Sequence, residues 1–304
     1  MLRELYVHHI FHIRHLYVII YQNNTRGENM DFIKMHGCGN DYIYFYNEIN
    51  ANLPSLSVKL SNRNTGIGGD GLVLILPSQK ADAMMRMFNA DGSESGMCGN
   101  AIRCVGKFLY ESGRVNSNKI TIETLSGIKE LSLHINNNIV ESATVNMGMY
   151  IIDPLQIPVD LPGDRIIARS VSIGGVDYSI TCCSMGNPHS VVFCPDVEQI
   201  KLNRIGPMFE KNPIFPQGVN AEFVQIIQRN HIKMRVWERG TGETLACGTG
   251  ACASAVASML NGYCDKDKNI LVDLMGGRLE ICVTNKAVYM TGPCVKVFEG
   301  RVDL

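Results

Sequence analysis

The sequence lacks a C-x-x-C cysteine pair, an excess of charge of either sign, and a hydrophobic run long enough to cross a bilayer. Its 11 cysteines, an odd number without that spacing, argue against a disulfide framework and a zinc ribbon, and they fit reduced thiols in a cytosol. The formal net charge of -1 gives no reason to expect nucleic acid or an anionic membrane as a partner. We therefore expect a cytoplasmic globular protein of one large domain or two ordinary ones.

Residues 1–30 differ from the rest of the chain because they hold half of the 8 histidines. The longest unbroken apolar run there, residues 16–21, is far short of the roughly 20 residues that a membrane-spanning helix needs. The segment also lacks the apolar core and the small-residue cleavage site of a signal peptide. We predict a poorly ordered extension, with a metal-binding histidine tract as the alternative. The histidines concerned are His8, His9, His12 and His15.

Two segments with the same pattern indicate an internal duplication. The segment "FNADGSESGMCGNAIRCVGKF" contains Cys98, and "WERGTGETLACGTGACASAVA" contains Cys247, at an offset of 149 residues. The same offset relates Asn89 to Glu238, and with a slip of two residues "GNDYIYF" matches "GNPHSVVF". Several collinear matches predict two homologous halves. Further pairs at the offset of 149 are Glu94 with Glu243, Ser95 with Thr244, and Gly99 with Gly248.

The coarse secondary structure agrees with two α+β halves. Segments such as "KITIET", "IKMRVW", "NILVDL" and "RLEICV" alternate in polarity or are rich in branched residues, as strands are. Clear helical segments are fewer, namely residues 101–111 and 251–261, each directly after a Cys-Gly pair. We therefore predict one central helix in each half, with the boundary between the halves near residues 145–150.

A cysteine at the start of each predicted helix gives the duplication a chemical meaning. The unpaired N–H groups and the positive end of the helix dipole favour a thiolate, and they also bind an anion such as a carboxylate. A twofold relation between the halves would place Cys98 and Cys247 on opposite sides of one bound ligand. A base on one side and an acid on the other invert a stereocentre, so the pattern predicts a two-thiol racemase or epimerase.

The segments "FIKMHGCGNDYIYF", "NADGSESGMCGNAIRC", "MGNPHSVVF" and "RVWERGTGETLACGTGACASA" resemble the signature segments of diaminopimelate epimerase. The resemblance implies a cofactor-independent isomerase, usually a homodimer, that interconverts LL- and meso-diaminopimelate in the synthesis of lysine and cell-wall precursors. It also implies a mixed or antiparallel sheet wrapped around the central helix of each half. One half would be residues 31–147 completed by residues 293–304, and the other would be residues 148–292.

The resemblance makes Cys98 and Cys247 the acid and base pair. It places His189 and Glu238 near the thiols, where they adjust the thiol pKa values, and it places Phe298 at the dimer contact, where the family has a tyrosine. It implies no metal and no cofactor. The ligand contacts of the family fall on Asn40, Asn89, Asn187, Asn220, Glu238 and Arg239, and the backbone groups that would hold the reacting carboxylate belong to Gly99, Asn100, Gly248 and Thr249.

Several of these residues also have an ordinary structural explanation. Asn40, Asn187 and Asn220 lie next to or near glycines, where asparagine is common in turns. Glu238 and Arg239 are neighbours, and neighbours on a regular strand point to opposite faces, so the backbone must leave the strand there if both bind one ligand. The departures from the commonest family pattern are Cys38, Gly71 and Ala101.

Two rival functions remain open at this point. The nearer is another isomerase of the same architecture that acts on proline, hydroxyproline or a related acid. The other is a thiol-based redox or metal-binding protein, for which the expected cysteine spacing is missing. The segment "GIGGDG" fits the G-x-G-x-x-G pattern, but it precedes a strand-like run and opens no helix, so we interpret it as a tight turn rather than a dinucleotide site.

Overall fold

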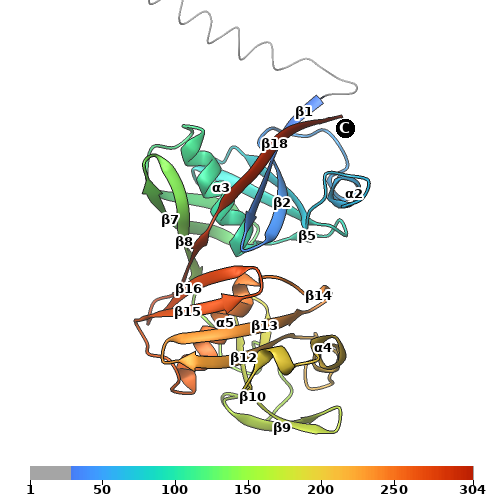
Figure 1. Ribbon diagram of the computed structural model, residues 1–304, viewed down its shortest axis with the longest axis vertical. Coiled ribbons are helices and arrows are strands. Elements are labelled where there is room, and N and C mark those ends of the chain that lie inside the picture. Colours follow the sequence, from blue (N-terminus) through green and yellow to red (C-terminus); the bar gives the residue numbers. More distant parts are fainter. Residues whose placement is uncertain (1–28, 304) are drawn as a thin grey trace, which may run out of the picture.

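The computed structural model describes residues 29–303 and shows two similar halves, one above the other in Figure 1. The predicted histidine tract with His8, His9, His12 and His15 lies outside the described residues. The first described strand begins at Asn29, which is within the segment assigned to the N-terminal extension.

Within residues 29–148, the N-terminal half contains two helices and a set of short strands. In chain order they are β1 (Asn29–Gly37), β2 (Asn40–Phe45), α2 (Leu53–Ser61), β3 (Gly71–Leu76), β4 (Ala83–Asn89), β5 (Glu94–Ser95), α3 (Gly99–Glu111), β6 (Lys119–Thr124), β7 (Gly127–Asn136) and β8 (Ile139–Gly148).

The C-terminal half repeats this succession of elements, and the last strand of the chain then returns to the first half. In chain order they are β9 (Arg169–Ile173), β10 (Val176–Ser184), β11 (Pro188–Phe193), the 3-10 turn η1 (Val197–Gln199), α4 (Leu202–Glu210), β12 (Asn220–Gln228), β13 (His231–Glu238), β14 (Gly242–Glu243), α5 (Gly248–Leu260), β15 (Asn269–Leu274), β16 (Gly277–Val283), β17 (Val288–Pro293) and β18 (Val295–Asp303).

The α+β class predicted from the sequence is confirmed, and the quoted strand segments fall on strands. "KITIET" and "NILVDL" coincide with β6 and β15, and "IKMRVW" and "RLEICV" lie within β13 and β16. The two predicted helices are α3 and α5, which begin two and three residues earlier than expected. Helices α2 and α4 were not predicted, because each contains a proline and has only nine residues.

The strands of the described residues form one mixed sheet in which the same order occurs twice. The order is β18-β1-β2-β3-β4-β6-β7-β8 in one half and β9-β10-β11-β12-β13-β15-β16-β17 in the other. The parallel pairs occur at corresponding places, β2–β3 and β4–β6 against β11–β12 and β13–β15. The duplication therefore extends from the cysteine motifs through the whole fold.

The two halves meet where β8 and β17, the strands at the end of each half of the sheet, pair in antiparallel fashion. In this pairing Val145 lies opposite Met290. The two residues are equivalent, because Val145 also pairs with Leu131 of β7 and Met290 with Ile281 of β16. The axis that relates the halves therefore passes between β8 and β17, in the segment that the sequence marked as their boundary.

Strand β18 crosses from the second half to the first and pairs with β1 along its length. In Figure 1 it is the dark red ribbon that lies beside the blue β1 in the upper half. It occupies the place that β9 has beside β10 in the other half. The exact domain boundaries stay a prediction, which this strand crossover supports.

In each half, the sheet wraps around the central helix. Helix α3 contacts β1 and β2 near one end of its sheet and β7 and β8 at the other, and α5 contacts strands from β10 to β17. Ten of the thirteen residues are buried in each of these helices. A helix that is buried on nearly all sides belongs to the interior, so each sheet holds a cysteine-bearing helix start in a fixed place.

Candidate active site at the two helix starts

Cys98 and Cys247 are the N-cap residues of α3 and α5, both with an extended backbone. The first helical residues are Gly99 and Gly248, and these face each other across the axis. A Cβ atom added to Gly248 would lie 3.8 Å from Cα of Gly99, and one added to Gly99 would lie 2.3 Å from Cε of Met290. Glycine at position 99 therefore leaves room for the end of the Met290 side chain between the two helix starts.

The thiol of Cys98 lies 3.4 Å from Oδ1 of Asn40. The amide of Asn40 is held in one orientation, because its Nδ2 donates to the carboxylate of Asp70 at 2.7 Å. A carboxylate only accepts, so the amide oxygen of Asn40 must face the sulfur. The same oxygen accepts from Nδ2 of Asn100 at 3.2 Å. In this structure Cys98 is therefore placed to donate as a thiol.

The thiol of Cys247 has different partners. The backbone N–H of Gly250 donates to its sulfur at 3.4 Å, and the hydroxyl of Thr249 lies 3.5 Å away. An N–H group that points at sulfur stabilises the thiolate. The two N-cap cysteines thus have equivalent backbones and unequal side-chain partners, an amide oxygen at Cys98 and a hydroxyl at Cys247.

Burial dominates the ionisation of both thiols. It raises the pKa of Cys98 above the usual cysteine value, although the backbone N–H groups of Ala101 and Asn100 lower it. Burial raises the pKa of Cys247 further, and the carboxylate of Glu238 adds to this effect. The helix starts alone predicted lowered thiol pKa values. The structure differs because desolvation outweighs the helix N–H groups when no ligand is bound.

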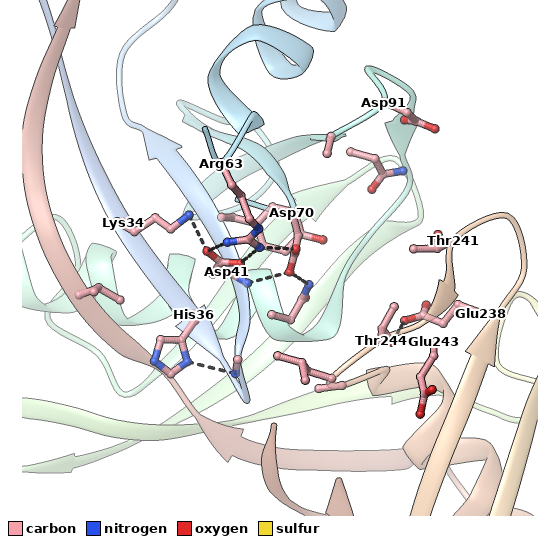
Figure 2. Close-up of a pocket in the computed structure, with 18 of the residues that line it drawn as sticks. Lys34, His36, Asp41, Arg63, Asp70, Asp91, Glu238, Thr241, Glu243 and Thr244 are labelled. Carbon is pink, nitrogen blue, oxygen red and sulfur yellow. Dashed lines mark hydrogen bonds and ion pairs between the residues drawn. The ribbon is translucent and has the colours of Figure 1, made fainter. Parts of the chain in front are cut away.

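A cleft of about 940 Å³ opens beside the two helix starts. Among the residues that line it are Asn40, Asn89 and Glu238, three of the ligand contacts implied by the sequence. Neither thiol lines the cleft directly, but Cys98 contacts Asn40 and Cys247 follows the lining residue Ala246. The cleft is large enough for a small amino acid. Figure 2 shows its two walls, with Glu238 and Thr244 opposite the side chains of the N-terminal half.

The N-terminal wall carries an ion-pair network that sequence reasoning missed. Lys34 pairs with Asp41 at 2.6 Å, and Arg63 pairs with Asp41 at 2.6 Å and with Asp70 at 2.8 Å (Figure 2). Burial acts to raise the pKa of Asp41, but hydrogen bonds from Arg63 and Lys34 hold it below the usual value. The network fixes Asp70, the acceptor of the Asn40 amide. Asp70 belongs to the "GIGGDG" segment, which the sequence predicted to be a tight turn. The sequence did not reveal that this turn contacts Asn40.

The remaining side-chain contacts predicted for the second half do not line the cleft. Asn187 contacts Nε2 of the buried His189 at 2.9 Å, and Asn220 donates to the carbonyl of Pro188 at 2.8 Å. The backbone N–H of Arg239 donates to Oδ1 of Asn220 at 3.0 Å. None of these residues lines the cleft, so their contact with a ligand stays a prediction.

The predicted pair of Glu238 and Arg239 diverges, as neighbours at the end of a strand do. Glu238 is the last residue of β13 and accepts a short hydrogen bond from Thr244. Arg239 is exposed, and its Nη1 donates to the carbonyl of Gln217 at 2.8 Å. The backbone leaves the strand through Gly240, whose φ of 79° is left-handed. In this structure only Glu238 faces the cleft.

Glu222 is a second residue that the sequence reasoning missed. It is fully buried, and its Oε1 lies 2.7 Å from Nδ1 of His189. Its Oε2 is buried without a hydrogen-bond partner among the described residues. Burial raises its pKa to about 7. An acidic residue within the apolar run "AEFVQII" was the available signal, but only the strand register shows that it reaches His189.

Phe298 lies at the mouth of the cleft on β18. It is 46% exposed and packs edge-on against Phe32, with ring centroids 5.9 Å apart. Val295 and Val297 of the same strand are also exposed. These side chains form an apolar edge beside the cleft, at the position that the sequence assigned to a dimer contact.

The described residues hold no group of three or more His, Cys, Asp and Glu side chains placed to bind a metal ion. In the same part of the chain, no helix is both long enough and apolar enough to cross a membrane. The described cysteines are all unpaired.

A model of the diaminopimelate epimerase family matches residues 32–152 and 181–297 of the chain. The chain is 52% identical to a diaminopimelate epimerase from Acetivibrio thermocellus over 279 residues, which cover 90% of this chain and 99% of that protein. It is 50% identical to the diaminopimelate epimerase of Methanococcus maripaludis, with coverage of 90% and 100%.

Solved structures share the fold at lower identity. A PhzF-family phenazine biosynthesis protein from Bacillus anthracis superposes with a TM-score of 0.63 at 18% identity, covering 90% of this chain and 99% of that one. A hydroxyproline epimerase from Agrobacterium vitis gives a TM-score of 0.63 at 15% identity, covering 92% and 93%. At this identity the likeness concerns the fold, in which different chemistries are found.

Proposed function

Because the chain belongs to the diaminopimelate epimerase family and is an isomerase, we propose that it interconverts LL- and meso-diaminopimelate through a pair of cysteines. The observation that carries the mechanism is the meeting of two equivalent helix starts, each with an N-cap cysteine, at Gly99 and Gly248. This arrangement offers one thiol to each face of a ligand held between the halves.

The proposed reaction is a proton transfer at the α-carbon with two bases. The thiolate of one cysteine removes the α-hydrogen as a proton and becomes a thiol. The electron pair left behind is shared between the α-carbon and the adjacent carboxylate. The thiol on the opposite face then gives its proton to the α-carbon, so the configuration inverts and the two cysteines exchange their roles. Each step conserves charge and protons without a cofactor.

The reacting carboxylate is proposed to bind the backbone N–H groups at the two helix starts, those of Gly99, Asn100, Gly248 and Thr249. Such groups lack a carbonyl partner within the helix and attract anions. They stabilise the enolate-like charge that develops in the transition state. The ammonium group beside the α-carbon is a cation near the sulfurs, and it lowers the thiol pKa values that burial raises.

The second zwitterionic end of the substrate is proposed to bind the polar walls of the cleft. Asn40, Asn89 and Glu238 line the cleft and offer amide and carboxylate groups. Asn187, Asn220 and Arg239 complete the contact set in this proposal, which requires the Arg239 side chain to leave Gln217 and turn toward the ligand. A substrate with a single charged end would leave these groups unpaired, which disfavours proline.

A homodimer in the cytoplasm is the proposed working form. The exposed apolar side chains of Val295, Val297 and Phe298 on the edge strand β18 support the dimer, since an apolar edge strand is a template for association. Phe298 also lines the cleft, so a partner packed there would cover the mouth of the site.

An exchange experiment tests the reaction. We expect the purified protein in deuterated water to place deuterium at the α-carbon of LL-diaminopimelate and to form the meso isomer, while L-proline remains unlabelled under the same conditions. Labelling of proline without labelling of diaminopimelate would replace this proposal with the nearer rival. Stoichiometric zinc in the purified protein, together with no exchange on either acid, would favour the metal-binding rival.

A further inference from the structure

Arg103 lies directly behind the start of α3 and is 0% exposed. Its Nη1 donates to the carbonyl of Gly99 at 3.0 Å, and its Nη2 donates to Oδ1 of Asn100 at 3.0 Å. Its Nε donates to the carbonyl of Pro293, the last residue of β17, at 3.2 Å. One buried cation therefore joins the helix of the first half to a strand of the second.

The guanidinium has neutral partners only. Among the ion pairs of the described residues none involves Arg103, and its remaining hydrogen-bond partner is Sδ of Met290 at 3.9 Å. Taking a charge out of water is costly unless an opposite charge compensates it. In the proposed reaction the anions near this place are a thiolate and the carboxylate bound at the helix starts. An anionic ligand therefore supplies the charge that Arg103 lacks in the ligand-free protein.

Two glycines, Gly37 and Gly292, leave the space that the Arg103 side chain occupies. A Cβ atom added to Gly37 would lie 2.7 Å from Nη2 of Arg103, and one added to Gly292 would lie 3.0 Å from the guanidinium carbon. The equivalent residue in the other half is Cys252, which is fully buried in α5. The same helix position thus accepts a small neutral side chain, so packing of a central helix does not by itself require an arginine.

Arg103 also fixes the side chain that links the two cysteine loops. Because Oδ1 of Asn100 accepts from Arg103, its Nδ2 must point away, where it donates to Oδ1 of Asn40 at 3.2 Å and to the carbonyl of Ala246 at 3.3 Å. Asn40 contacts Cys98, and Ala246 directly precedes Cys247. A single buried amide thus ties the surroundings of one thiol to those of the other.

We propose that Arg103 is a positioning residue for the proton transfer, which orients Asn100 so that both cysteine loops keep their places and which contributes positive charge to the anionic groups of the cleft. This inference rests on the proposed function, since it gives the charge a role only if thiolate chemistry occurs there. A purely structural arginine would hold α3 to β17 and would leave the reactivity of the thiols unchanged.

The first test measures thiol reactivity and needs no substrate. Iodoacetamide is allowed to react with the full chain over a range of pH, and mass spectrometry of the peptides that contain Cys98 and Cys247 gives the alkylation rate at each. In Arg103→Gln we expect the midpoint for Cys98 to move to higher pH by about one unit, because Asn100 loses its fixed orientation and a buried cation at the start of α3 is removed. In Cys252→Ala, the matched control, we expect no movement.

The second test asks whether Arg103 acts through Asn100. In Arg103→Lys the charge remains, but an ammonium does not reproduce the fork that bonds Gly99 and Asn100 together. We expect kcat for diaminopimelate exchange to fall about tenfold with KM changed by less than about threefold, because the loss affects the reacting groups. We expect Arg103→Lys in an Asn100→Ala background to cause no further loss, since residues that act through one another are not additive.

A folded Arg103→Gln protein with the alkylation profile and kcat of the wild type would overturn the inference. If Arg103→Gln does not fold, Arg103→Lys decides the matter, because wild-type kcat in that variant, or losses that add to those of Asn100→Ala, would equally overturn it. A wild-type protein inactive on diaminopimelate would refute the proposed function instead. The alkylation comparison between Arg103→Gln and Cys252→Ala would still stand in that case.

Discussion

The two helix starts share a backbone but differ in buried charge. Cys98 and Cys247 occupy equivalent N-cap positions, with first-turn glycines that face each other across the axis. Behind the first helix start lies a buried cation, Arg103, while beside the second lies the buried pair of His189 and Glu222. Inversion of one carbon needs matched positions on its two faces. The charges around these positions are free to differ, because the two isomers of the substrate are not equivalent.

The offsets of the duplication identify which residues of the first half correspond to Glu222 and His189. Glu222 corresponds to Val73 of β3, and His189 corresponds to Tyr42 of β2. Tyr42 and Val73 are buried, as their counterparts are. The acid and imidazole therefore occupy positions that the other half fills without an acid or an imidazole. The symmetry belongs to the backbone and the thiols, and the asymmetry belongs to the side chains packed behind them.

Removal of either thiol should produce the largest effect and tests the symmetric part of the comparison. We expect Cys98→Ala and Cys247→Ala each to lower epimerisation by at least about a thousandfold, because each removes the acid or base for one face. Turnover of LL- and of meso-diaminopimelate measures the loss, and circular dichroism checks that the fold is retained. Full turnover in either variant would show that the two positions are not partners.

The second prediction concerns the buried carboxyl of Glu222, which has no counterpart in the first half and should affect the stability of the protein. Its pKa is raised to about 7, so the folded protein holds a proton that the unfolded chain loses near pH 4. The folded state binds more protons over this window, and its stability should therefore fall as the pH rises from about 4 to 7. The raised pKa corresponds to a loss of about 3 kcal/mol across this range.

In Glu222→Gln we expect this pH-dependent loss to disappear, since a neutral amide can keep the contact with His189. Urea unfolding at pH 4 and at pH 8 measures the free energy of unfolding at the two ends of this pH range. Glu94→Gln is the control, because Glu94 is exposed in the first half and pairs with Arg86. If the free energy of unfolding changed equally with pH in the wild type and in Glu222→Gln, the buried pair would not be the source of the pH dependence.

The symmetric features were predictable from the sequence because they are local. The Cys-Gly motifs, the offset between them and the small residues that follow fix both helix starts within a few neighbouring residues. The strands "KITIET" and "NILVDL" were equally readable, since alternation over six residues suffices. Duplication strengthened each inference, because every pattern occurred twice.

The asymmetric features depend on contacts between distant residues. The bond from Arg103 to Pro293 joins residues 190 positions apart, and the bond from Glu222 to His189 joins residues 33 apart across two strands. Such contacts follow from the sheet order and register, which the composition of a segment does not reveal. Arg239 likewise turns away from the cleft in this structure, because its guanidinium donates to the carbonyl of Gln217, 22 positions earlier in the chain.

The smallest expected effect comes from Asp70, which orients Asn40 in the first half only. In Asp70→Asn the new amide can both donate and accept, so it no longer forces the oxygen of Asn40 toward Cys98. We expect kcat to fall severalfold to about tenfold, with little change in KM, because the thiol loses a fixed acceptor while the cleft keeps its shape. Asp82→Asn serves as the control, since the carboxylate of the exposed Asp82 accepts hydrogen bonds only from Thr121 of the same half. If Asp70→Asn changed KM alone, the carboxylate would be acting on the ligand rather than on Asn40. An unchanged kcat would mean that Cys98 needs no oriented amide, and the unequal hydrogen bonds at the two thiols would then have no consequence for the rate.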